Sequence, residues 1–160
     1  MEDSPQAAQE SSPKATGTGK APVGKRLIAA IIDWVIAAVV SMIPVVGGVV
    51  GAAYMLFRDG FEFDFMDRRS LGKKVMNLRP VTLDGSPVDL SVSATRNWMF
   101  AIGPLGGALV SIPGIGLILI PVVLVAGLAG LVIGIVELIL IFTNDQGRRW
   151  GDSLANTMVV

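Results

Sequence analysis

The sequence predicts an all-α membrane protein, a bundle of four transmembrane helices with a small cytoplasmic β-hairpin between the second and third helices. Three observations carry this prediction. Hydrophobic residues make up 52% of the chain and charged residues only 16%, which is too apolar for an ordinary soluble domain of 160 residues. Four apolar stretches are long enough to form helices. Every Lys and Arg lies outside these stretches or at their ends.

The chain is expected to begin with a disordered tail, residues 1–23. Its Ser, Pro, Gly, Ala, Gln and Thr with scattered charges cannot bury a core. No apolar signal-peptide region precedes Lys25, so we expect the first transmembrane segment, about residues 26–43, to be its own uncleaved anchor. Residues 24–160 then form one transmembrane domain.

The first transmembrane segment contains a carboxylate, Asp33. A central Asp costs about 2.5–3.5 kcal/mol on insertion, and the nine Leu, Ile and Val of the segment together return about 3–5 kcal/mol. Helical spacing places Arg26, Asp33 and a row of alanines on one face, while the larger apolar residues point away. Small residues mark the packing face of a transmembrane helix. We therefore expect Asp33 to face protein.

The second and third transmembrane segments, about residues 45–58 and 96–111, contain glycines four residues apart. The pairs are Gly47 with Gly51 and Gly103 with Gly107. Such pairs let helix backbones approach closely, within one chain or between two copies in a homo-oligomer. The fourth segment, about residues 115–143, is the longest and most apolar.

The one long polar connection, residues 58–97, holds seven Lys or Arg and six Asp or Glu. Within it, Asp84 and Gly85 lie between β-compatible residues, which predicts the small hairpin at residues 81–88. Three phenylalanines of residues 61–65 alternate with acidic residues, a pattern typical of a piece that lies in the headgroup layer.

The cations set the expected topology. They precede the first segment, fill the connection between the second and third, and follow the fourth, whereas the two short connections carry no charge. The positive-inside rule therefore places both termini and residues 58–97 in the cytoplasm.

A second carboxylate, Glu137, lies in the fourth segment. Asp33 is seven residues inside Arg26 and Glu137 seven residues inside Asn144, so both are expected about 10 Å below the cytoplasmic boundary. Both also lie on small-residue faces, which predicts that the first and fourth segments meet. The two carboxylates would then share a proton or take Arg26 or Arg96 as counter-ion. One interpretation is a cation or proton site; the other is structural polar pairing.

Several segments in order resemble the RDD family of prokaryotic membrane proteins, named for one Arg and two Asp. Arg26 and Asp33 match its first two signature residues, and Asp152 matches the third. The stretch 70–88 resembles the family's LGK segment and DG turn. Arg96 resembles the Arg that opens the family's next transmembrane span. Gly151 stands where the family often has His. We expect Asp152 to pair with Arg26 or to cap a short helix.

The resemblance implies a multi-pass protein of the prokaryotic inner membrane that transports an undefined ligand, and some relatives resemble sodium/proton exchangers. We therefore expect transport of a small ligand or exchange of a monovalent cation for protons. The alternative is a membrane adaptor or assembly factor that binds a partner through residues 58–97. No nucleophile and base pair or metal-ligand cluster is found, so we expect no enzymatic activity. We also expect no cofactor and no nucleic-acid partner.

Overall fold

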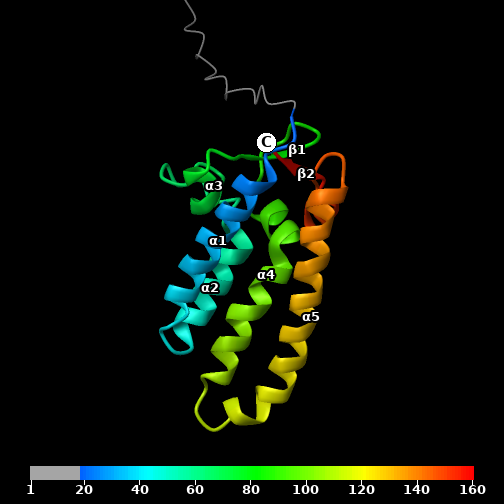
Figure 1. Cartoon of the computed structure of the whole chain (residues 1–160). Coiled ribbons are helices and arrows are strands. Elements are labelled where there is room, and N and C mark those ends of the chain that lie inside the picture. Colours follow the sequence, from blue (N-terminus) through cyan, green and yellow to red (C-terminus); the bar gives the residue numbers. More distant parts are fainter. Residues whose placement is uncertain (1–18) are drawn as a thin grey trace, which may run out of the picture.

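The computed structural model describes residues 19–160, which form six helices and two short strands (Figure 1). The helices are α1 (Val23–Val40), α2 (Val46–Phe57), α3 (Leu71–Val75), α4 (Leu90–Val110), α5 (Gly116–Thr143) and α6 (Trp150–Leu154), and the strands are β1 (Pro80–Thr82) and β2 (Thr157–Val159). Most of the predicted disordered tail, residues 1–23, lies outside the described residues.

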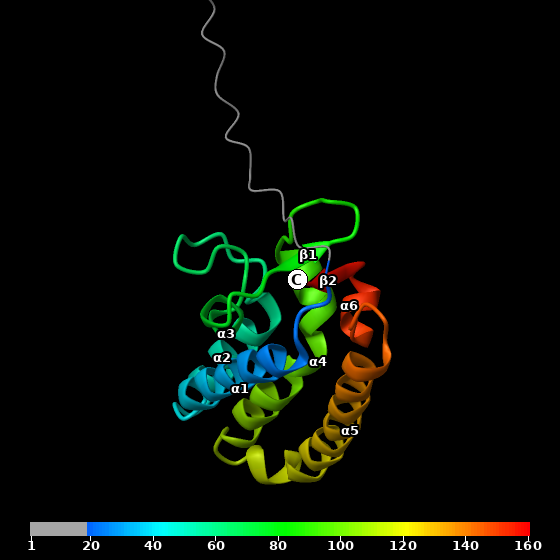
Figure 2. The ribbon, with the colours of Figure 1, turned by 45° about the horizontal axis from the view of Figure 1, so that its top comes forward.

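The four longer helices run side by side, and everything else gathers at one end of them (Figure 1). The turns that join α1 to α2 and α4 to α5 lie at the far end, whereas α3, α6, the two strands and the C-terminus lie together at the other (Figures 1 and 2). α2 packs against both α1 and α4, and α4 in turn packs against α5. The four expected helices are therefore present and alternate in direction.

The face of α1 that was predicted to be buried is the buried one. Arg26, Ala29, Asp33 and Ala37 are its buried residues. Its large apolar side chains, such as Val35, are exposed on the opposite side. The small residues allow the neighbouring elements to approach closely enough to enclose Asp33.

Close helix packing involves glycines of α2 as expected, but other residues of α4. A Cβ added to Gly48 would come within 2.7 Å of the Ala108 side chain, and one added to Gly51 within 2.6 Å of the Ser41 hydroxyl. In α4, by contrast, Gly107 has no atom of the described chain near that position, whereas Gly106 packs against Val123 of α5. Of the expected pair, Gly103 faces the Trp34 ring of α1, 3.7 Å from an added Cβ, whereas Gly107 makes no contact within the described residues.

The predicted β-hairpin between the second and third helices is wrong. β1 pairs in antiparallel fashion with the C-terminal strand β2, with Val81 opposite Met158. The turn itself forms, since Gly85 adopts a positive φ of 81° and the Asp84 carboxylate accepts a hydrogen bond from the Ser86 amide at 2.9 Å. The chain then enters α4 instead of a second strand, because Asp89 caps that helix by accepting from the Val92 amide at 2.8 Å.

One described helix, α5, is by length and composition able to cross a membrane; its most apolar stretch has a mean hydropathy of 2.8. None of that stretch is buried by the rest of the chain. α1 carries three charged residues and α2 has only 12 residues, so neither is both long enough and apolar enough to cross a membrane by the same criterion. The expectation of a helical membrane protein is thus met in its coarse form, with one clear candidate span among residues 19–160.

Candidate functional site

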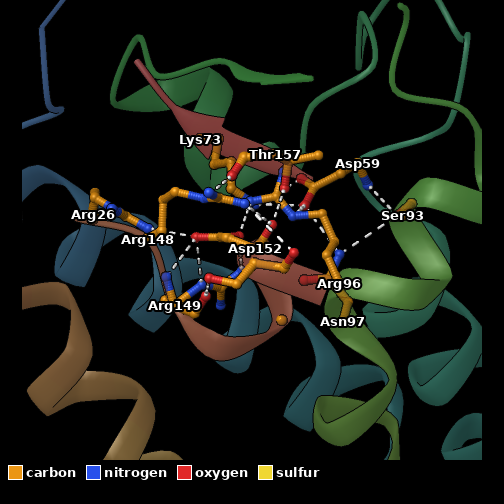
Figure 3. A network of polar contacts seen from close by, with 12 residues as sticks. Arg26, Asp59, Lys73, Ser93, Arg96, Asn97, Arg148, Arg149, Asp152 and Thr157 are labelled. Atoms are coloured by element: carbon orange, nitrogen blue, oxygen red, sulfur yellow. Dashed lines mark hydrogen bonds and ion pairs between the residues drawn. The ribbon is translucent and has the colours of Figure 1, made fainter. Parts of the chain in front are cut away.

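The chain buries many charged side chains at the end of the bundle where α3, α6 and the strands gather. Nine charged side chains of residues 19–160 are buried there: Arg26, Asp33, Arg58, Asp59, Lys73, Arg96, Glu137, Arg149 and Asp152. Figure 3 shows how several of them interlock. Buried charges are tolerated only when they are paired and hydrogen-bonded, so their partners define the site.

Asp152 of α6 is the most heavily paired carboxylate. Its Oδ1 accepts from Arg96 Nη2 at 2.6 Å and Arg149 Nη2 at 3.1 Å, and its Oδ2 accepts from Arg26 Nη2 at 3.0 Å (Figure 3). Burial raises the pKa of Asp152, but the Arg149 and Arg96 guanidinium groups outweigh it and hold that pKa well below its usual range. The carboxylate therefore stays ionised and ties α1 and α4 to α6.

Both structural roles expected of Asp152 are present together. Besides pairing with Arg26, its Oδ2 accepts a hydrogen bond from the Arg149 amide at 3.2 Å, which satisfies a free backbone donor at the start of α6. The neighbouring Gly151 is required for this approach, because a side chain there would strike the Arg96 backbone carbonyl. A His at this position would not fit the close contact seen here.

A second paired carboxylate, Asp59, follows α2 directly. Lys73 Nζ lies 2.6 and 2.8 Å from its two oxygens, and Asn97 Nδ2 donates to Oδ2 at 3.0 Å. Arg96 Nε lies 3.6 Å from Oδ2, so Arg96 links Asp59 to Asp152. Burial raises the pKa of Asp59, but Lys73, Arg96 and Arg58 together bring it well below the usual range.

Asp33 faces protein as predicted, but its counter-ion is neither Arg26 nor Arg96. Its Oδ2 accepts from Arg58 Nη1 at 3.2 Å, and its Oδ1 accepts from the Tyr54 hydroxyl at 2.7 Å and the Gly72 amide at 2.8 Å. Because α2 folds back along α1, Arg58 at the end of α2 comes beside Asp33 on α1. Both oxygens of Asp33 are thus occupied by donors.

Glu137 of α5 is less completely paired than Asp33. Its Oε1 accepts from the Gly151 amide at 3.1 Å, and Arg149 Nε lies 3.6 Å from its Oε2. Within residues 19–160, Oε2 has no hydrogen-bond partner although Glu137 is only 3% exposed. A buried acceptor without a donor is costly, so this oxygen is available to a proton or to a ligand donor.

The prediction that the first and fourth segments meet is wrong. α1 does not pack along α5, because α4 stands between them and makes the contacts with α5. A groove of about 480 Å³ lies between the three helices, and Glu137 and Arg149 line its polar end. Asp33 is not among the groove's lining residues, so the two carboxylates belong to different surroundings.

The aromatic ring of Phe100 lies close to the counter-ions of both carboxylates. The guanidinium carbon of Arg58 lies 5.5 Å from the ring centroid and that of Arg149 lies 5.2 Å from it. Cation–π attraction is stronger in a site shielded from water. Phe100 therefore holds the counter-ion of Asp33 and the counter-ion of Glu137 at fixed positions.

Comparison with known protein families gives a match over most of the described chain. A profile of the RDD family matches residues 47–156, more than half of the chain. The chain belongs to the RDD family. Neither the curated proteins nor the solved structures that were searched gave a match. RDD proteins are membrane proteins whose function is not generally defined, so the family does not by itself assign an activity.

The three residues that resemble the RDD signature, Arg26, Asp33 and Asp152, form two separate contacts in this structure. Arg26 pairs with Asp152 at 3.0 Å, whereas Asp33 pairs with Arg58 at 3.2 Å. Arg26 and Asp33 precede the matched range and Asp152 lies inside it. No three acidic side chains gather as metal ligands in the described part of this RDD chain.

Four members of the buried cluster were not singled out from the sequence: Arg58, Asp59, Lys73 and Arg149. Their position in the sequence could have indicated them, because Arg58 and Asp59 follow the second apolar segment and Arg149 follows the fourth. Lys73 lies in the LGK segment of the RDD pattern, where Ser70 caps α3 by accepting from the Lys73 amide at 3.2 Å. That cap fixes the short helix so that the Lys73 side chain reaches Asp59.

Proposed function

We propose that this RDD protein crosses the membrane four times and moves a small ligand or exchanges a monovalent cation for protons, with Glu137 as the exchanging group. The four longer helices expose large apolar side chains, while the charged side chains Arg26, Asp33, Arg96 and Glu137 within them are buried, as suits a lipid environment. α1 would then lie with Lys25 and Arg26 at the cytoplasmic boundary, and α2 would be a short span.

The observation that carries the proposal is that Glu137 Oε2, at the polar end of the groove, lies 3.6 Å from Arg149 Nε and accepts no hydrogen bond from the described residues. The groove gives a ligand or a hydrated cation access between α1 and α5, and Glu137 offers an acceptor there. Arg149 can remain neutralised by Asp152 when Glu137 takes up a proton or a ligand, because both carboxylates contact it. Asp33, with three donors in place, is the weaker candidate for exchange.

The test measures ion and proton flux in sealed vesicles that contain the purified full chain. Sodium, potassium and lithium gradients are imposed across the native chain, Glu137→Gln and Asp33→Asn, and internal pH is followed with a trapped dye. We expect proton movement coupled to one gradient in the native chain and its loss in Glu137→Gln. Glu62→Gln, whose side chain is 70% exposed, is the matched control.

Two outcomes would contradict the proposal. Equal flux in the native chain and in Glu137→Gln would exclude the exchanging role of Glu137; loss of flux in Asp33→Asn alone would transfer that role to Asp33. No flux from correctly folded native protein would exclude exchange of these cations and favour the adaptor function.

The adaptor function has its own supporting observation in the connection after α2. Phe61, Phe63 and Phe65 stack on one another with centroids 5.3 and 5.5 Å apart, and Phe63 and Phe65 remain more than half exposed. Lys74 Nζ donates to the Phe65 carbonyl at 2.6 Å and holds the segment in place. Such a partly exposed stack of three phenylalanine rings suits insertion among lipid headgroups or contact with a partner protein. Binding to vesicles should weaken in Phe63→Ser if the stack inserts.

We also propose that any homo-oligomer forms through glycines of α5 that line the groove, so that a second copy would occupy the groove in place of a ligand. Gly127, Gly130 and Gly134 have no atom of the described chain within 4 Å of an added Cβ. These small residues could receive a helix of a second copy. Crosslinking in the membrane would detect it.

A further inference from the structure

A second, smaller cavity lies inside the buried charge cluster and is distinct from the groove. Its volume is about 60 Å³, and it is enclosed by α1, by α3 and by residues near the C-terminus. Its charged lining consists of Arg26, Arg58, Lys73, Arg149 and one carboxylate, Asp33. All five residues are buried, with 1–9% of each residue exposed. Four cations and one carboxylate therefore line one small, partly open cavity.

The whole buried cluster of residues 19–160 is also unbalanced in charge. It contains five cations, the four that line the cavity and Arg96, and four carboxylates, Asp33, Asp59, Glu137 and Asp152. One positive charge is therefore in excess. Each cation contacts a carboxylate, but Asp152 is shared by three guanidinium groups, so the pairs do not balance one to one. A buried charge is costly unless it is fully paired and hydrogen-bonded.

Unused hydrogen-bond donors accompany the excess charge. Arg58, which lines the cavity and is 3% exposed, has an Nε–H with no partner among the described residues. Arg96, fully buried behind it, likewise leaves Nε and Nη1 without a hydrogen bond in that part of the chain. Buried donors of this kind are normally satisfied by protein or by a bound species. What is missing around the cavity is an acceptor rather than a donor.

We propose that this cavity binds a small inorganic anion of the size of chloride. About 10–15 Å³ of such space is needed to hold one water, so 60 Å³ accommodates a monatomic anion with a few waters but not an acyl chain. The anion would neutralise the excess charge and accept from Arg58 and Lys73. Asp33 keeps its own three donors and would not need to leave.

Lys73 is the group most affected by such an anion. Burial is the main cause that lowers the pKa of Lys73 to about 7; Asp59 opposes this change, and Arg58 and Arg96 contribute to it. A negative charge in the cavity favours the ammonium form, which holds the pair with Asp59. The anion would thus stabilise the contact between α3 and the end of α2.

The experiment compares the full native chain in uncharged detergent micelles with chloride, bromide or gluconate as the sodium salt at constant ionic strength. Unfolding is followed by tryptophan fluorescence, and chloride binding is followed directly by the line width of its NMR signal. We expect chloride and bromide to raise the midpoint of unfolding by several degrees, saturably, and gluconate to have no effect. The chloride NMR line should broaden when the protein is present, and added bromide should return the line width to that of free chloride.

A cavity-filling variant separates the site from general salt effects. Ala30→Val narrows the cavity without removing any charge, and Ala38→Val adds the same volume on an exposed position of α1. We expect the chloride response to disappear in Ala30→Val and to persist in Ala38→Val. If Ala30→Val does not fold, the native NMR competition decides the question.

Three results would overturn the proposal. They are equal stability of the native chain in chloride and gluconate, an unsaturable response shared by Ala30→Val, and stabilisation by inorganic phosphate or anionic lipid without any by chloride. The last would instead assign the excess charge to a phosphate group. None of these measurements depends on the flux test, so the anion site and the proposed transport can fail separately.

Discussion

At the scale of the residue, Asp152 is the centre of the buried cluster because three guanidinium groups depend on it. Asp152→Asn would leave Arg26, Arg96 and Arg149 without their shared carboxylate. Removing one partner of a buried ion pair costs about 3–5 kcal/mol. We expect a loss of unfolding free energy of that size, measured by thermal or chemical unfolding in micelles. Asp145→Asn, on an exposed turn, should change it by less than about 0.5 kcal/mol.

The depressed carboxyl pKa values also predict acid sensitivity. An Asp in the unfolded chain has a pKa of about 3.9. In the folded chain burial raises the pKa of Asp152, but the neighbouring arginines lower it by more, so its pKa lies below that value. The pKa of Asp59 is lowered in the same way by Lys73 and Arg96. The unfolded state then binds more protons, so stability should fall as the pH falls below about 5. Tryptophan fluorescence across pH 7 to 3 would measure it. Asp152→Asn should show a shallower decline; an equal slope would contradict the assignment.

At the scale of the element, α3 depends on a contact that only glycine allows. A Cβ at Gly72 would strike the Ala29 backbone carbonyl of α1, and the Gly72 amide would move away from Asp33. Overpacking of this kind costs about 1–3 kcal/mol, so Gly72→Ala should lower the unfolding midpoint. Gly127→Ala in α5 meets no atom of the described chain within 4 Å and is the matched control. Equal midpoints in the two variants would show that α3 does not need this contact.

Helix periodicity could predict the buried face of α1 because that face is a local property of 18 consecutive residues. The counter-ion of Asp33 could not be predicted the same way, since Arg58 reaches it only after α2 folds back. The prediction that β1 belongs to a local hairpin was wrong for the same reason, because its partner β2 lies more than 70 residues later in the chain. Local patterns specify which residues are enclosed, whereas the partners depend on how distant segments are brought together.

At the scale of the whole molecule, polarity is distributed in the opposite sense to that of a water-soluble domain. The buried apolar cluster is small, with Ala21, Ala29, Leu78 and Val159 at its centre, whereas α5 exposes most of its large apolar side chains. In water such a surface would associate or aggregate. In a bilayer it needs no partner, and the charge cluster then supplies the specific contacts between elements.

The direction of insertion follows from where the cations lie, and it can be tested because the chain contains no Cys. The end with α3, α6 and the strands holds the Lys and Arg that follow the apolar helices, whereas residues 41–45 and 111–115 hold none. Cations are retained on the cytoplasmic side. Ser86→Cys and Ser111→Cys, both at exposed positions, report the two ends. A membrane-impermeant maleimide should label Ser111→Cys in intact cells but Ser86→Cys only after the membrane is opened. The reverse pattern would place the buried charge cluster on the outer side, and labelling of both positions in intact cells would mean that α4 does not cross the membrane.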